Sequence, residues 1–404
     1  MNKTGDFGKN RSNWPRTMET HRLFSLIDNF LGLFVNYRNN GRIPPPRSIL
    51  LVNSAHLGDL VISTSLLPVL RHAFPQVKIG FLIGSWGKAV VENHPLVNRV
   101  HYLDHWHLNR DQKPLGKKIL SYTSQRQKVI PEIREQGYDV AICLRFLFFK
   151  FVPPIWEAGI PYRLGYDFGG FAPLLTHVLP LRMEFGGKHE VMYQAELLSF
   201  LDVPEKSYAY LWPNLPPGTE QGKAEVELLL GGCRNYRVLH IGSGLKLREW
   251  PRNRWQTLAR RLLEENHVLV FTGVGEYERR AIGEIRNSLP NCLDACDRLS
   301  WEGLVELVRG AELVYSVETS VGHVASAVHT PSVAISGGFA DPLQWKPYGD
   351  QCVLATVDLP CVPCFQRNGC NSMACVRDLS VEAVWEAGEK AMEFKQRHNP
   401  LTRF

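Results

Sequence analysis

The sequence predicts an α/β protein made of two Rossmann-like domains that face a central cleft. Short apolar runs, which suit buried strands, alternate with longer segments of helical periodicity, and this alternation is typical of parallel sheets with helices on both faces. A segment rich in Pro and Gly at 213–218 interrupts the pattern, which then begins again. Several strands end in glycine or small polar residues, at the carboxyl ends where open α/β sheets bind ligands.

Length and composition fit a soluble protein of two or three domains. The chain has 404 residues, of which 44% are hydrophobic and 21% charged, and a net charge of +6. The positive excess is concentrated before residue 50 and suits an anionic partner such as phosphate, nucleotide or lipid, but it is too weak and scattered to predict nucleic-acid binding. No apolar run reaches the ~20 residues of a membrane span. The lack of a secretory signal and the odd number of cysteines, 9 in all, predict a cytoplasmic protein.

Residues 1–46 are expected to form a basic N-terminal segment. Within it, residues 21–38 carry apolar side chains at helical spacing between basic flanks, which predicts an amphipathic helix. Such a helix either packs on the body of the protein or lies in a membrane interface.

The first domain is predicted over 47–215. Its strands are expected at 49–52, 77–82, 100–103, 140–144 and 163–166, and a helix at 60–74. Gly58 and Asp59 close the polar turn after the first strand. Glycine permits a tight turn or the close approach of a ligand. Asp59 is either an ordinary cap of the following helix or, inside the cleft, a carboxylate that accepts a proton from an attacking hydroxyl.

The second domain is predicted over 216–380. Strands are expected at 237–241, 267–272, 313–317 and 333–335, and helices at 255–265, 277–289 and 299–309. Ser243 lies in the glycine turn after the first of these strands, and Lys246 and Arg248 follow, with charges that suit pyrophosphate oxygens. Glu276 and Glu278 follow the next glycine turn. They would either hold ribose hydroxyls or act as helix caps at the protein surface.

A strand–turn–helix pattern at 313–328 is the most informative feature of this domain. Thr319 or Ser320 would cap the helix after Glu318 and leave its first N–H groups free for a phosphate. Gly322 lies in the first turn, and His323 would donate to a phosphate, contact the sugar, or simply pack. Alone, the pattern fits an ordinary capped helix equally well.

Four cysteines cluster near the end of this domain, at Cys361, Cys364, Cys370 and Cys375. Four thiolates would suit a structural zinc ion, although the spacing departs from paired CxxC motifs. The alternative is a set of reduced thiols. Residues 381–404 are expected to form a C-terminal helix and tail.

Taken in order, these motifs resemble glycosyltransferase family 9, the ADP-heptose lipopolysaccharide heptosyltransferases and their relatives. The resemblance extends from about Arg47 to Val384. It rests on the strand and Gly-Asp turn at 49–68, on His189-Glu190, on the Arg-Glu-Trp-Pro run at 248–251, and on the Glu-Thr-Ser-Val-Gly-His run at 318–323, which is similar to the family's Asp-Thr-Gly-x-x-His. This chain has Glu where the family signature has Asp, Ser where it has Gly, and Arg where it has Lys before Trp-Pro.

The resemblance implies a GT-B fold and an inverting, metal-independent transfer of a heptose from ADP-heptose to a lipopolysaccharide-core or related glycan. Asp59 would be the general base. The implied donor-binding residues are Gly58, Ser243, Lys246, Arg248, Glu276, Glu278, Glu318, Thr319, Ser320, Gly322 and His323. The implied partners are a nucleotide-sugar donor, with ADP favoured, a lipid-linked glycan acceptor and the inner face of the membrane, with no nucleic acid. No cofactor would be required for catalysis, and zinc would be structural. Two alternatives stay open: a non-catalytic nucleotide-sugar-binding scaffold and a GT-B sugar-nucleotide epimerase.

Overall fold

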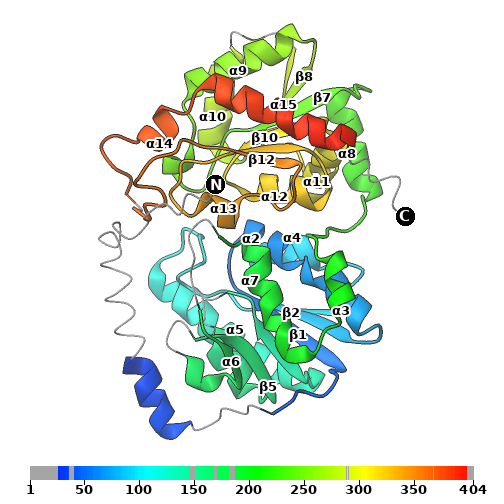
Figure 1. Ribbon diagram of the computed structural model, residues 1–404, viewed down its shortest axis with the longest axis vertical. Helices are drawn as coiled ribbons and strands as arrows, with labels where there is room; N and C mark the ends of the chain where they lie inside the picture. Colours follow the sequence, from blue (N-terminus) through cyan, green and yellow to red (C-terminus); the bar gives the residue numbers. More distant parts are fainter. Residues whose placement is uncertain are drawn as a thin grey trace, which may run out of the picture. The chain divides into compact units, whose positions relative to one another are not determined.

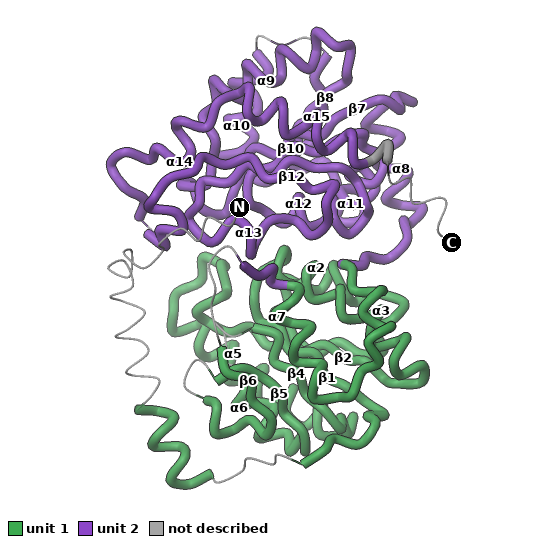
Figure 2. Tube along the Cα trace, in the orientation of Figure 1, with its two compact units in different colours: residues 1–184, 191–212 green, residues 185–190, 213–404 purple. Residues whose placement is uncertain are grey.

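The protein consists of two compact units (Figure 2). The computed structural model describes residues 26–35, 41–145, 151–167, 171–181, 187–287, 289, 291–366 and 368–397. Unit 1 comprises Met1–Glu184 and Val191–Trp212, and unit 2 comprises Phe185–Glu190 and Pro213–Phe404. The main division therefore falls at 212/213, beside the predicted boundary at 215, and one short segment before it belongs to unit 2.

Unit 1 contains a six-stranded parallel sheet with the strand order β3-β2-β1-β4-β5-β6. The strands are β1 (Ser48–Asn53), β2 (Lys78–Ile83), β3 (Arg99–Tyr102), β4 (Val140–Cys143), β5 (Tyr162–Tyr166) and β6 (His177–Leu179). The helices are α2 (Leu57–Ser63), α3 (Leu66–Ala73), α4 (Lys88–Val91), α5 (Leu115–Gln136), α6 (Val152–Glu157) and α7 (Glu190–Glu196). Every residue of β1 and β4 is buried, as expected for central strands of a parallel sheet covered on both faces.

Unit 2 repeats this design with the order β12-β11-β10-β7-β8-β9. Its strands are β7 (Tyr236–His240), β8 (Val268–Thr272), β9 (Cys292–Asp294), β10 (Leu313–Val317), β11 (Ser332–Ile335) and β12 (Cys352–Ala355). Its helices are α8 (Glu220–Leu230), α9 (Arg252–Glu264), α10 (Gly275–Arg286), α11 (Trp301–Gly310), α12 (Ser320–Ala327), α13 (Pro342–Trp345), α14 (Ala374–Arg377) and α15 (Val381–Arg397). The last of these lies across the sheet, in contact with β10, β11 and β12 (Figure 1).

Each sheet has one topological switch point. Read from β3 and from β9, both sheets have the strand order 3-2-1-4-5-6 of the Rossmann fold, which reverses direction between β1 and β4 in unit 1 and between β7 and β10 in unit 2. Open α/β sheets bind ligands outside the carboxyl ends of the strands at such a reversal. The residues that follow these four strands are therefore the first candidates for a functional site.

The helix predicted over 60–74 is in fact two helices, α2 and α3. The break occurs at Thr64 and Ser65, where the Thr64 hydroxyl donates to the carbonyl of Val61 at 2.6 Å. Threonine and serine hydroxyls that bond the preceding turn compete with helix continuation.

Residues 26–34 form a helix that packs on unit 1 by one side and exposes the other. Leu31 and Val35 contact the core, and the Asp28 carboxylate accepts a hydrogen bond from the Ala172 backbone at 3.2 Å. Four large apolar side chains on this helix are between 61% and 80% exposed: Leu26, Phe30, Leu33 and Phe34. The other parts of the predicted helix 21–38 lie outside the described residues. Among the described residues, each helix is too short or too polar to cross a lipid bilayer.

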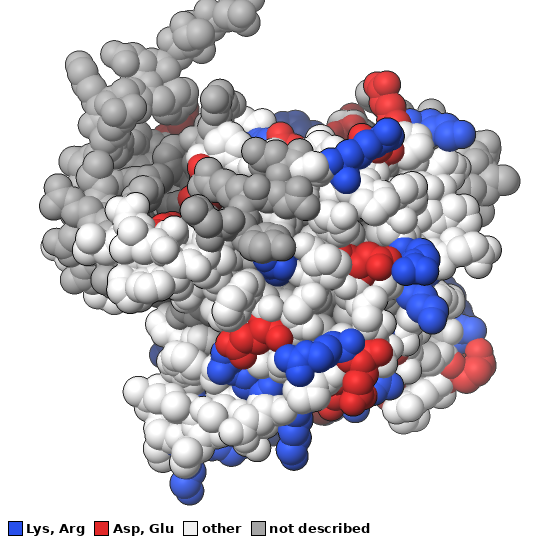
Figure 3. Space-filling view, turned by 90° about the horizontal axis from the view of Figure 1, so that it is seen from below, with Lys and Arg blue, Asp and Glu red and all other residues white. Residues whose placement is uncertain are grey.

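Figure 3 shows how the charged side chains of the described residues are distributed on one face of the molecule. On this face, Lys and Arg of the described residues lie beside Asp and Glu, and those residues form no continuous basic field. This distribution agrees with the scattered charge of the sequence.

Candidate active site

In unit 1, Asp59 lies at the switch point. It is the third residue of α2, the first helix after β1, and one of its carboxylate oxygens, Oδ2, accepts a hydrogen bond from the His56 backbone at 3.2 Å. The turn itself is held by Asn53, whose amide donates to the Asp59 carbonyl at 3.1 Å. The Asp59 side chain is 16% exposed, so it is largely shielded from water but still accessible to a ligand. The adjacent Gly58 is part of the helix rather than of a tight turn, so only the close approach of a ligand remains as its predicted role.

Arg145 completes this part of the site. It follows β4, the strand next to β1, and its Nη1 lies 2.8 Å from Oδ1 of Asp59. Its side chain is only 6% exposed. No local motif marks this residue in the sequence, because the contact depends on β1 and β4 being neighbours in the sheet, although they are far apart in the chain.

In unit 2, Glu318 follows β10 at the switch point and contacts Ser336 and Arg248. Its Oε1 accepts a hydrogen bond from the Ser336 hydroxyl at 2.5 Å, and its Oε2 lies 3.4 Å from Nε of Arg248. Arg248 also donates from Nη1 to the Glu318 carbonyl at 3.3 Å. Burial raises the pKa of Glu318, while the Arg248 charge and the Ser336 hydroxyl lower it. Within the described part of the chain, the buried Oε2 accepts no hydrogen bond.

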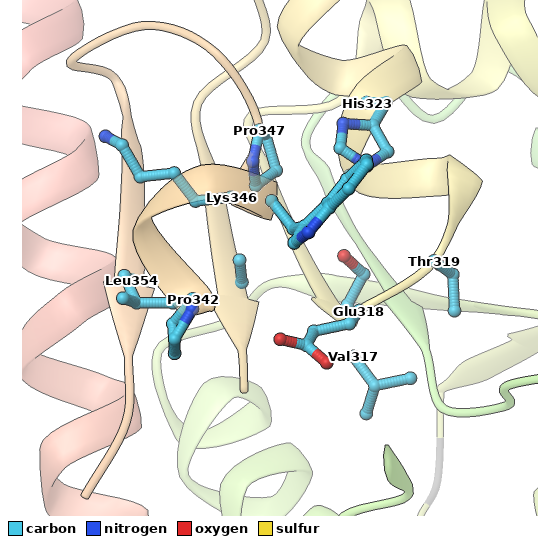
Figure 4. A pocket seen from close by; sticks show the side chains of 12 residues that line it. Val317, Glu318, Thr319, His323, Pro342, Lys346, Pro347 and Leu354 are labelled. Carbon is cyan, nitrogen blue, oxygen red and sulfur yellow. The ribbon is translucent and has the colours of Figure 1, made fainter. Parts of the chain in front are cut away.

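A pocket opens at this end of β10 (Figure 4). Glu318 and Thr319 reach it from the strand end, and His323 reaches it from α12, whereas the Lys346 side chain extends away from Glu318. Because its lining combines the Glu318 carboxylate with the Thr319 hydroxyl and the His323 imidazole, the pocket suits a ligand with hydroxyl groups.

The start of α12 borders the same pocket. Thr319 is the N-cap, and its hydroxyl accepts a hydrogen bond from the Val321 backbone at 3.3 Å, which confirms the predicted cap. Ser320 is the first helical residue. A Cβ at Gly322 would lie 2.9 Å from Cγ of Pro347 and 3.1 Å from Oγ of Ser316. Gly322 therefore allows the helix to pack tightly at the edge of the pocket.

The two cations predicted after β7 have different surroundings. Lys246 places its ammonium 4.5 Å from the centre of the Tyr277 ring, whereas Arg248 is paired with Glu318. Ser243 lies in the turn between them and β7, and its hydroxyl accepts a hydrogen bond from the Leu245 backbone at 3.3 Å. The Arg248 guanidinium also lies 5.4 Å from the centre of the Phe339 ring.

The two glutamates after β8 also differ. Glu278 packs against the glycine turns, because a Cβ at Gly242 would lie 2.0 Å from its carboxyl carbon, and its Oε2 accepts from a backbone N–H at 2.9 Å. Burial raises the pKa of Glu278. Glu276 is exposed and pairs with Arg280 at 3.6 Å. Ribose binding stays a prediction for both.

The four clustered cysteines are free thiols, with Cys361 and Cys370 exposed and Cys364 and Cys375 half-buried. Burial raises the pKa of the Cys375 thiol, and the other three cysteines add to this effect, so they lie near it. Within the described ranges, no three His, Cys, Asp or Glu side chains are arranged to hold a metal ion. Zinc binding therefore stays a prediction.

The chain is similar to heptosyltransferases in sequence. The profile of glycosyltransferase family 9 (heptosyltransferase) matches residues 126–374. Lipopolysaccharide heptosyltransferase 2 of Escherichia coli is 25% identical over 317 residues, which cover 74% of this chain and 86% of the relative. Lipopolysaccharide heptosyltransferase 1 of Pseudomonas aeruginosa is 24% identical over 328 residues, which cover 79% of this chain and 86% of the relative.

Two solved structures share the fold. The glycosyltransferase family 9 protein from Veillonella parvula has a TM-score of 0.72 at 19% identity and covers 86% of this chain and 98% of its own. The ADP-heptose lipopolysaccharide heptosyltransferase II of E. coli has a TM-score of 0.66 at 21% identity, with coverages of 86% and 99%. The predicted GT-B fold of two parallel α/β domains is thereby confirmed.

Proposed function

The chain belongs to glycosyltransferase family 9 and is therefore a glycosyltransferase, and we propose that it transfers a heptose from ADP-heptose to a lipopolysaccharide-core or related lipid-linked glycan. The similar proteins are named as lipopolysaccharide heptosyltransferases, and each is matched over 86% of its length. The observation that carries the proposal is the Glu318 pocket, in which a buried carboxylate paired with an arginine lies beside the capped start of a helix.

The donor is proposed to bind at this pocket in unit 2. The N–H groups at the start of α12 and the cations Lys246 and Arg248 would face the diphosphate, because helix N-termini and guanidinium groups both favour phosphate oxygens. Glu318, which lines the pocket, would accept a hydrogen bond from a hydroxyl of the sugar. His323, on the same helix, would donate to the phosphate or contact the sugar.

Asp59 is proposed as the general base of an inverting, metal-independent displacement. The acceptor oxygen bonds to the anomeric carbon while its proton moves to the Asp59 carboxylate. The bond between the anomeric carbon and the diphosphate oxygen breaks on the opposite side, and ADP leaves with that electron pair. Protein cations and the start of α12 would stabilise the leaving charge in place of a metal.

The test is to incubate the purified protein with ADP-heptose, with and without a lipopolysaccharide-core acceptor that lacks the heptose, and to follow ADP release and product mass. The proposal predicts that the heptose mass is added to the acceptor and that ADP is released in equal amount, in buffer containing a metal chelator. Isomerised donor without acceptor would indicate an epimerase. Tight ADP binding with no turnover in either arm would indicate a scaffold.

We also propose that the enzyme works in the cytoplasm, at the inner face of the membrane, through the helix at 26–34. Its four exposed apolar side chains lie on one side, while Leu31 and Asp28 fix the other side to unit 1. Complete burial of one such side chain contributes about 1.5–3 kcal/mol, and the basic excess before residue 50 suits anionic lipid.

Flotation with vesicles that contain anionic lipid tests this contact. The parent should float with the vesicles, and Leu33→Glu/Phe34→Glu should remain in the soluble fraction. Asn29→Glu is the matched control, because it adds a charge at an exposed position of the same helix that carries no apolar side chain. Equal flotation of the double variant would remove this helix from the proposal.

A further inference from the structure

We propose that Arg145 is a positioning residue that holds the Asp59 carboxylate in the orientation needed to accept the acceptor's proton. This inference rests on the proposed function, because it gives Arg145 a role only through Asp59. It concerns a residue that the sequence motifs do not include, and it adds a second group to the unit 1 side of the reaction.

The first argument is the position of the pair. Asp59 follows β1 and Arg145 follows β4, and these strands are paired in register from Ile49↔Val140 to Val52↔Cys143. The Leu144 backbone extends the pairing by donating to the Val52 carbonyl at 3.0 Å. Arg145 is the next residue after Leu144, whose backbone is hydrogen-bonded to β1. The sheet therefore fixes the position of the backbone that carries the Arg145 side chain.

The second argument is the geometry of the carboxylate. Arg145 contacts Oδ1 at 2.8 Å, while the His56 backbone donates to Oδ2 at 3.2 Å. A carboxylate offers about four lone-pair sites on its two oxygens. These two donors direct the plane of the group and leave acceptor capacity for an incoming hydroxyl. A planar guanidinium suits this task better than a flexible ammonium, because its donors are fixed relative to one another.

The third argument is the cost of the pair. Arg145 is 6% exposed and Asp59 is 16% exposed, so both charges lose most of their hydration. Well-packed apolar residues often stabilise a fold as well as a buried ion pair does. The charge pair lies at the ligand-binding end of the sheet rather than within its core, which points to a role in the reaction.

The experiment is a double-mutant cycle on kcat and KM, with Asp59→Asn, Arg145→Met, the double variant and Arg145→Lys. We expect Arg145→Met to lower kcat about 10²-fold, the loss typical of a misplacement near 1 Å, with the KM for ADP-heptose within about twofold of the parent. In the Asp59→Asn background, Arg145→Met should have little further effect. Arg145→Lys should have a higher kcat than Arg145→Met but a lower kcat than the parent, because lysine keeps the positive charge but lacks the planar set of guanidinium donors.

The outcomes separate this inference from the proposed function. Parental turnover by Asp59→Asn would remove the proposed base itself. If Asp59→Asn is impaired but Arg145→Met keeps the parental kcat, only the role of Arg145 is wrong. If the two losses multiply, or if Arg145→Met mainly raises the KM for the acceptor, Arg145 acts on the substrate instead. Should Arg145→Met fail to fold, parental kcat and KM in folded Arg145→Lys would overturn the proposal.

Discussion

Replacing Arg248 by alanine should destabilise unit 2 by an amount that grows as the pH rises. Glu318 is buried, and its pKa is raised by burial and lowered by Arg248. At their separation of 3.4 Å, opposite unit charges attract by about 5 kcal/mol for an effective dielectric constant near 20. Arg248 is 26% exposed, and both groups lose hydration on pairing, so we expect a net loss of about 2–3 kcal/mol near pH 8.

The sign of the pH dependence follows from the raised pKa of Glu318. A folded-state pKa above the ordinary value of 4.5 means that the folded protein binds this proton more tightly than the unfolded chain. The resulting stability is complete below the unfolded pKa and is lost as the pH rises through the folded pKa. Arg248→Ala removes the neighbouring charge and raises the pKa further. The difference between parent and variant should therefore be small near pH 4.5 and largest near pH 8.

The stability difference of unit 2 between the parent and Arg248→Ala can be measured at about pH 5 and about pH 8 by calorimetry that resolves the unfolding of the two units. Glu318→Gln/Arg248→Ala is the matched control, because it lacks the titrating group and should lose the pH dependence. Parallel stability curves for the parent and Arg248→Ala across this range would refute the reasoning. So would a pH dependence in the control as strong as that of Arg248→Ala.

Three further predictions concern the second unit. Arg248→Ala should weaken ADP binding by about 1.5–3 kcal/mol in calorimetric titrations if its guanidinium meets the diphosphate, whereas a loss confined to Lys246→Ala would assign that contact to Lys246. Gly322→Ala should cost about 1–3 kcal/mol of stability, because its Cβ would lie 2.9 Å from Pro347; an unchanged melting temperature would contradict this packing. If the four clustered cysteines bind zinc, elemental analysis should find about one metal per chain and a chelator should lower the melting temperature. If elemental analysis finds no metal in protein prepared under reducing conditions, the four cysteines are packed thiols.

The central strands could be predicted from the sequence because burial on both faces leaves a continuous apolar run. The runs at 49–52 and 313–317 correspond to β1 and β10. The edge strands β6, β9 and β12 were not predicted. β6 has only three residues, and its sequence, His-Val-Leu, has no distinctive apolar run. Short edge strands depend on pairing with a neighbour more than on their own composition.

The candidate site could be predicted only where its signal is local. Thr319 caps its helix as its residue type and position indicate, and Asp59 lies in the first turn of α2. The contacts of Arg145 with Asp59 and of Ser336 with Glu318 join segments that are distant in the chain. They arise from the order of strands in each sheet, which a single sequence does not specify residue by residue.

The most direct test of the central claim is the rate of ADP release from ADP-heptose in the presence of acceptor, compared between the parent and Asp59→Asn. We predict that the variant loses about 10²–10⁴ in kcat while its affinity for ADP stays near that of the parent, because a general base acts in the transition state. Parental ADP release by folded Asp59→Asn would contradict the account.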